Sequence, residues 1–177
     1  MRRLILLGAM LCVFITSNAQ KLKIEQLEQM LTASIDEAEE SLFLIGYTFV
    51  SKKNLADSAG FIYTFSNRKQ TIGTAKKVWK AVYYKESNLS FVKYITYDRE
   101  EFERFRRSML ETGFSREDKN INENSTWLKD NLQVRCEVGT DEFENIAFEI
   151  KLNYTKAPIK EKTLKKIGLK SILQKKE

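Results

Sequence analysis

The chain of 177 residues contains no histidine, which limits the chemistry that its side chains can perform. Histidine is the commonest general base, the commonest metal ligand and the usual activator of a serine or cysteine nucleophile. Two carboxylate runs remain, Glu100-Glu101-Glu103 and Asp141-Glu142-Glu144. General acid–base pairs need carboxylates in different environments, whereas such runs usually form solvated faces and turns. We therefore expect no catalytic residue, and a hydrolase is the least favoured function.

Motifs for metals, cofactors and phosphates are also absent from the sequence. There is no Gly-rich phosphate loop, no Cys or His ligand spacing and no nucleophile elbow. The run at Asp141 lacks the alternating oxygen ligands and the glycine of an EF-hand loop. We expect no metal site and no cofactor.

Aromatic residues in strands are the best candidates for contact with a partner. In residues 78–84 both alternating faces are substantially apolar, so one face exposes aromatic surface if the other packs against helices. Tyr and Trp bury large areas at low entropic cost, which is typical of contact sites. The alternative is a sheet that is covered on both faces. The candidate aromatic binding residues are Tyr63, Trp79, Tyr83 and Tyr94.

Two strand lysines, Lys80 and Lys93, complete the candidate binding residues. The alignment that turns Val78 and Val82 inward also turns Lys80 inward, and Lys93 follows, opposite Ile150. Two inward lysines would suit the acidic end of an apolar ligand. A one-residue slip that turns both lysines outward avoids burying charge, and we expect that arrangement.

The helices that must support these strands follow from apolar periodicity. From residue 24 to 45 the apolar residues recur at gaps of three and four, and Gly46 follows in the position of a C-cap. One helix is therefore expected to end at Gly46, and the capping box Ser34-Ile35-Asp36-Glu37 leaves open a break near Ser34 into two shorter helices. A further helix begins at the N-cap Asp98, with Glu101 reaching back, and ends at Gly113.

Extended segments follow each helical region, and the two halves resemble each other. Residues 41–47 match 108–114, and residues 89–97 align with 146–154, which equates Phe91 with Phe148. We predict an α+β fold with a largely antiparallel sheet of six to seven strands and two helices. The two tandem helix-plus-meander repeats would be 22–97 and 98–155, and chance similarity between amphipathic patterns is the alternative. The expected strands are 47–51, 60–66, 78–85, 89–97, 126–130, 132–138 and 146–154.

The first nineteen residues predict a secretory signal peptide. Arg2 and Arg3 precede an apolar run that is too short to span a membrane, and Ser17 and Ala19 fit a cleavage site. We expect cleavage after Ala19 and a single α+β domain, residues 20–155, in the periplasm or outside a bacterial cell. A membrane anchor is the alternative.

Cleavage after residue 19 would leave Cys136 as the one cysteine of the mature chain. An intramolecular disulfide is then impossible, despite the oxidising compartment. The alternating neighbours Val134 and Val138 predict that Cys136 points into the core. A buried thiol without a histidine behaves as a small hydrophobe, so we interpret Cys136 as structural.

The net charge of +6 belongs to the ends of the chain. Residues 156–177 carry eight lysines and two glutamates, and residues 4–155 sum to −2. The domain therefore has no reason to attract nucleic acid. In this basic tail, Leu164, Ile167, Ile172 and Leu173 lie near one helical face, a pattern compatible with binding to an anionic membrane or partner surface. A frayed terminus is the alternative.

These patterns favour an exported, non-catalytic binding protein of the bacterial envelope that recognises a protein or a glycan through an aromatic sheet face. The first alternative is a carrier that holds an apolar or amphipathic ligand between helix and sheet, with Lys80 or Lys93 at its acidic end. The second alternative is the hydrolase.

Overall fold

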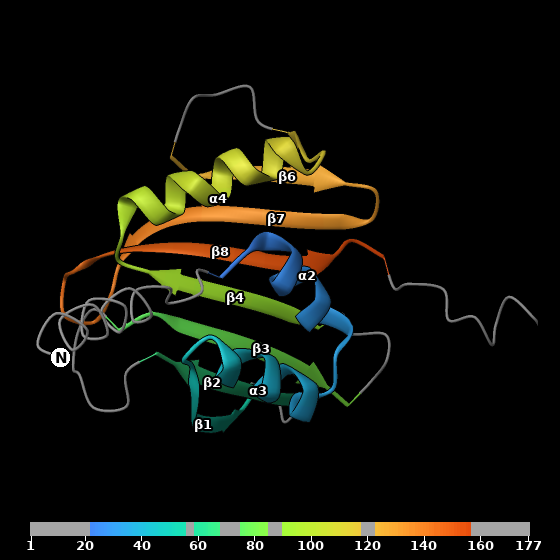
Figure 1. Ribbon diagram of the computed structural model, residues 1–177, viewed down its shortest axis with the longest axis vertical. Helices are drawn as coiled ribbons and strands as arrows, with labels where there is room; N and C mark the ends of the chain where they lie inside the picture. Colours follow the sequence, from blue (N-terminus) through green and yellow to red (C-terminus); the bar gives the residue numbers. More distant parts are fainter. Residues whose placement is uncertain (1–21, 56–58, 68–74, 85–89, 118–122, 157–177) are drawn as a thin grey trace, which may run out of the picture.

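The computed structural model describes residues 22–55, 59–67, 75–84, 90–117 and 123–156, which form three helices and eight strands (Figure 1). The α+β class with an antiparallel sheet is confirmed, and the predicted numbers of six to seven strands and two helices were too low. The helices are α2 (Ile24–Thr32), α3 (Ile35–Leu44) and α4 (Arg99–Glu111). The strands are β1 (Thr48–Asn54), β2 (Gly60–Ser66), β3 (Lys77–Tyr83), β4 (Phe91–Thr96), β5 (Ser115–Arg116), β6 (Ser125–Lys129), β7 (Leu132–Thr140) and β8 (Ile146–Tyr154).

The eight strands form one sheet in the order β1-β2-β3-β4-β8-β7-β6-β5, and every neighbouring pair is antiparallel. Strands β1 to β4 form one meander and β5 to β8 form another. The two meanders join where β4 pairs with β8, with Tyr94 opposite Ile150. The last strand of each meander therefore lies in the middle of the sheet (Figure 1).

The break between α2 and α3 accounts for the additional helix. Ser34 is the N-cap of α3: its hydroxyl accepts from the Glu37 backbone N–H at 3.2 Å, and the Glu37 carboxylate accepts from the Ser34 N–H at 2.7 Å. This capping box satisfies backbone donors that a continuous helix would have bonded internally. The break near Ser34, which the sequence left open, is present, and the single helix expected from residue 24 to 45 is two.

Both helical regions end in the same way, at glycines with positive φ. Gly46 has φ of +87° and Gly113 has φ of +89°, a conformation that glycine adopts without steric cost. The residue after each glycine turns back onto its helix, because Tyr47 N–H donates to the Leu42 carbonyl and Phe114 N–H donates to the Met109 carbonyl, both at 2.9 Å. This is the Schellman arrangement, and it buries Tyr47 and Phe114 beneath the helices.

The core lies between the helices and one face of the sheet. Cys136 belongs to it, with no exposed surface, which confirms the predicted inward orientation. Burial of this apolar surface is the main favourable term in folding. The helices contribute Ile24, Leu27, Met30, Leu42, Phe102, Phe105 and Met109, and the strands contribute Phe65, Val78, Val92, Tyr94, Val134, Cys136, Ile150 and Leu152.

The alignment that equates Phe91 with Phe148 is wrong. Phe148 lies in the core opposite Thr96, whereas Phe91 lies on the other face of the sheet opposite Asn153. A shift of one residue turns every side chain of a strand to the opposite face, so the two aromatics do not occupy equivalent positions.

The predicted signal peptide and nearly all of the basic tail lie outside the described residues. Within the described ranges, no helix is long and apolar enough to cross a membrane.

Candidate functional site

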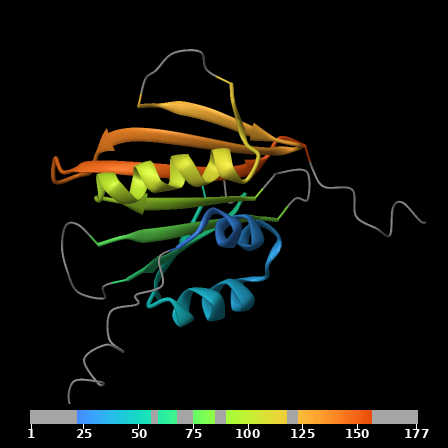
Figure 2. The same cartoon turned by 45° about the horizontal axis from the view of Figure 1, so that its top comes forward.

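The candidate site is the face of the sheet that points away from the helices, which we call the outer face. All three helices lie on the same side of the sheet, and in the described part of the chain no helix or strand lies over the other side (Figures 1 and 2). Because side chains alternate along a strand, β3 places Val78 and Lys80 under the helices and Trp79, Ala81 and Tyr83 on the outer face. Trp79 and Tyr83 are partly exposed there.

Two aromatic rings of the outer face are paired with lysines. The Lys93 ammonium lies over the Trp79 ring, 4.6 Å from its centroid, and the Lys151 ammonium lies over the Phe91 ring at 4.4 Å. Such cation–π contacts stabilise the charge on the negative face of the ring. Lys93 also forms an ion pair with Glu149 at 2.7 Å. The outer face therefore combines aromatic rings with charged side chains.

The structure divides the six predicted binding residues between the two faces. Trp79, Tyr83 and Lys93 lie on the outer face. Tyr63, Tyr94 and Lys80 are directly paired with helix-facing residues and lie under the helices. The sequence reasoning did not select Phe91 and Lys151, although the alternation of β4 and β8 contains them. They could have been found from strand alternation, because each lies next in sequence to a core residue and so points to the opposite face of the sheet.

Lys80 corrects the prediction that both lysines point outward. It is 3% exposed, and its ammonium donates to the Met30 carbonyl near the C-terminal end of α2. The last carbonyls of a helix lack partners within the helix, so this contact satisfies both groups. Burial lowers the pKa of Lys80 to about 8, and the nearby Glu37 carboxylate opposes that shift. Lys93 does point outward, as expected.

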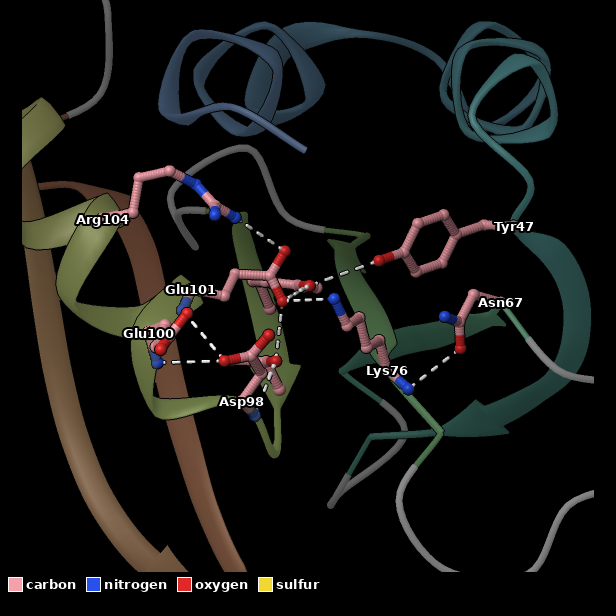
Figure 3. A network of polar contacts seen from close by, with 9 residues as sticks. Tyr47, Asn67, Lys76, Asp98, Glu100, Glu101 and Arg104 are labelled. Atoms are coloured by element: carbon pink, nitrogen blue, oxygen red, sulfur yellow. Dashed lines mark hydrogen bonds and ion pairs between the residues drawn. The ribbon is translucent and has the colours of Figure 1, made fainter. Parts of the chain in front are cut away.

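A buried polar network on the helix side of the sheet gathers around Glu101 (Figure 3), and Tyr94 belongs to it. The Tyr47 hydroxyl donates to the Tyr94 hydroxyl at 3.4 Å, and the Tyr94 hydroxyl donates to Glu101 Oε2 at 3.0 Å. The Thr96 hydroxyl donates to the same oxygen at 2.8 Å. Burial raises the pKa of Tyr47 to about 12 and also raises the pKa of Tyr94. Both phenols therefore stay protonated near neutral pH and serve as donors.

Glu101 is the centre of this network. The sequence predicted that its carboxylate would cap the N-terminus of α4, and that prediction is wrong. The Asp98 carboxylate accepts from the Glu100 and Glu101 amides at the N-terminus of α4, whereas the Glu101 side chain turns inward and is 2% exposed. Its two oxygens meet Lys76 at 2.5 Å and Arg104 at 3.1 Å (Figure 3). With the hydroxyl donors, these cations offset the cost of removing a carboxylate from water. Every group is satisfied within the protein, so the network reads as structural.

A cleft of about 420 Å³ opens between the two helical regions, at the start of α2 and along α4. Leu22, Ile24 and Phe105 supply its apolar lining, and Arg104 lies at its wall. Lys80 and Lys93, which the carrier hypothesis assigns to the ligand, are not among its lining residues. Within the described residues no group of three or more His, Cys, Asp or Glu side chains is arranged to hold a metal ion.

Comparison with known proteins found no matching family model, no matching curated protein and no matching solved structure.

Proposed function

We propose that this protein is an exported, non-catalytic binding protein of the bacterial envelope that recognises a protein or a glycan through its outer face. The observation that carries the proposal is the gathering of Trp79, Tyr83 and Phe91 on a sheet face over which no described element lies. Partly exposed aromatic residues on neighbouring strands are costly to hydrate and bury large areas on association. Such residues supply most of the binding energy in many interfaces.

The location and the lack of catalysis are supported by the sequence. The first nineteen residues have the three regions of a signal peptide, and the chain has no histidine. We propose further that the basic residues 156–177 add attraction to an anionic membrane surface near the partner. Nucleic acid is not a proposed partner, because residues 4–155 are slightly acidic.

The test is recovery of the partner from native envelope extract on the immobilised protein, followed by a binding measurement with purified partner. The double variant Trp79→Ala/Tyr83→Ala should weaken binding by about 2 kcal/mol or more. Phe143→Ala is the matched control, since this aromatic side chain is exposed but belongs to the turn between β7 and β8. Equal binding by the double variant and the control would refute the proposal.

A carrier function has one observation in its favour, the cleft between α2 and α4. Its volume lies within the range of about 300–1,000 Å³ that small-molecule sites occupy. An amphipathic ligand would place its apolar part on Leu22, Ile24 and Phe105. Its polar end would meet the Lys23, Glu25 and Glu111 side chains of the lining, since Arg104 is already paired with Glu101. Native mass spectrometry of protein purified without detergent would detect such a ligand.

A further inference from the structure

We infer that the outer face binds an acidic α-helix of a partner protein, which lies across the strands over a row of cations formed by Lys93, Lys151 and Arg135. This inference rests on the proposed function and specifies the chemistry of the partner. We call these three residues the cation row.

The cation row follows directly from the register of the sheet. Lys93 on β4 is opposite Lys151 on β8, and Lys151 is opposite Arg135 on β7. Three like charges therefore stand side by side on three adjacent strands. Like charges directly opposite each other destabilise a sheet. A folded protein can nevertheless keep such a row where a bound anion offsets the repulsion.

Among the described residues, only one member of the row has a carboxylate partner, although the Lys151 ammonium also lies over the Phe91 ring. Lys93 pairs with Glu149, whereas no carboxylate of the described residues lies within 4.0 Å of Lys151 or Arg135. Across the neighbouring strands β2, β3, β4, β8 and β7, the outer face carries four cations and two carboxylates. The cations are Lys77, Lys93, Arg135 and Lys151, and the carboxylates are Glu137 and Glu149. This face is thus basic although residues 4–155 as a whole are acidic.

The aromatic rings of this face favour a protein over a glycan. Sugar rings stack on the flat face of an aromatic side chain, and here the Lys93 and Lys151 ammonium groups already lie over the Trp79 and Phe91 rings. A carboxylate can reach such an ammonium from outside without displacing it from the ring. The exposed parts of the aromatics then remain available for apolar side chains of the partner.

The spacing of the row matches a helix. Neighbouring strands lie about 4.8 Å apart, so the row presents one cation at each such interval. Residues three and four apart on a helix have Cβ atoms about 5–6 Å apart. A helix with Asp or Glu along one face can therefore form ion pairs with Lys93, Lys151 and Arg135 in turn. The row continues at Trp79, which is opposite Lys93 and would meet an apolar residue of the same stripe.

The test is an NMR titration of the full exported chain with a synthetic alanine-based helical peptide that carries glutamates on one stripe and a leucine at its end. A peptide of the same composition with the glutamates distributed around the helix is the matched probe. We expect amide shifts confined to β4, β8 and β7, and binding about tenfold weaker for the scrambled peptide. Lys151→Gln/Arg135→Gln should weaken binding about tenfold.

The matched control is Arg107→Gln/Lys52→Gln, which removes the same two charge types from exposed positions outside the outer face and should bind as the parent does. Equal binding of the two peptides, or binding of oligogalacturonate at the row without binding of the helical peptide, would overturn the inference. If a partner recovered from the envelope depends on Trp79 and Tyr83 but not on Lys151 and Arg135, the inference fails while the proposed function stands. If binding of that partner depends neither on Trp79 and Tyr83 nor on Lys151 and Arg135, the proposed function and this inference are both refuted.

Discussion

Lys76 and Glu101 form an ion pair of 2.5 Å that joins the two halves of the chain. Lys76 immediately precedes β3, in the first meander, and Glu101 lies in α4, which precedes the second. Tyr47, which follows α3, reaches the same carboxylate through Tyr94. Groups from three distant parts of the sequence thus share one buried acceptor, so α4 is fixed to the first meander by polar contacts as well as by packing.

Glu101→Ala should lower the free energy of unfolding by about 3 kcal/mol, measured by urea denaturation. The change leaves the buried Tyr94 and Thr96 hydroxyls without their acceptor, and each unsatisfied group costs about 1–3 kcal/mol. Lys76 and Arg104 are partly exposed and can turn to water, which limits the loss.

Glu103→Ala is the control for this prediction, because Glu103 also lies on α4 and pairs with Arg106 but is 41% exposed, against 2% for Glu101. Exposed pairs contribute about 0–1 kcal/mol. Similar losses in the two variants would show that the buried network does not stabilise the fold.

Because Lys80 is buried, we predict that the free energy of unfolding rises with pH between pH 8 and 9. Burial lowers the pKa of Lys80 from its ordinary 10.5 to about 8, so in this window the unfolded chain holds a proton that the folded protein has released. Stability increases with pH wherever the unfolded state binds more protons, here by about 1 kcal/mol across one pH unit. Above pH 9 the effect is opposed, because burial raises the pKa of Cys136 to about 12 from 9.0.

Urea melts at pH 8 and pH 9 measure this slope directly. In Lys80→Met the rise between the two pH values should disappear, since the variant lacks the ammonium whose lowered pKa produces it. A slope that persists in the variant would assign the effect to another residue.

Cys136 should react with thiol reagents in the unfolded chain and resist them in the native protein. Its side chain has no exposed surface, and its raised pKa disfavours the reactive thiolate. The added cysteine of Glu137→Cys, which lies next along β7 and is exposed, should react quickly without denaturant. Fast native labelling of Cys136 itself would contradict the placement of this strand face.

Mass spectrometry of the exported protein should find a terminus at Gln20, in part cyclised to pyroglutamate. Ser17 and Ala19 occupy the positions that signal peptidase requires. An intact Met1 in the exported pool would remove the basis for the proposed location.

Local signals in the sequence identified the parts of the fold that local physics decides. The capping box at Ser34 and the glycines at 46 and 113 act within a few residues, and each lies where the sequence predicts. Alternation in β7 likewise placed Cys136 correctly, since only one face of that strand is apolar. The two-residue β5 was missed because so short a strand exists only through its pairing with β6.

The orientations of Lys80 and Glu101 depend on partners that are distant in the sequence, so local patterns did not predict them. Lys80 points inward because the α2 carbonyl at Met30 accepts its ammonium, and no pattern within β3 reveals that acceptor. Glu101 has the spacing of a capping residue, but Lys76 and Tyr94 draw it into the core. Of the candidate site, Trp79 and Tyr83 were found together because they share the parity of β3, whereas Lys93 was selected with Lys80 as a ligand-binding lysine and lies beside Trp79 on the outer face. Tyr63 and Tyr94 were placed with them by residue type alone.

Trp79 gives the sharpest test of the outer face. Its ring is partly exposed and lies beneath the Lys93 ammonium, so Trp79→Ala removes one cation–π contact and some apolar packing. We expect a loss of about 1–2 kcal/mol in urea denaturation, below the roughly 3–5 kcal/mol that truncation of a core aromatic costs. Phe102→Ala, a fully packed aromatic of α4, should show that larger loss in the same assay. If the two variants lose equal stability, Trp79 is a core residue, and the outer face loses its aromatic anchor.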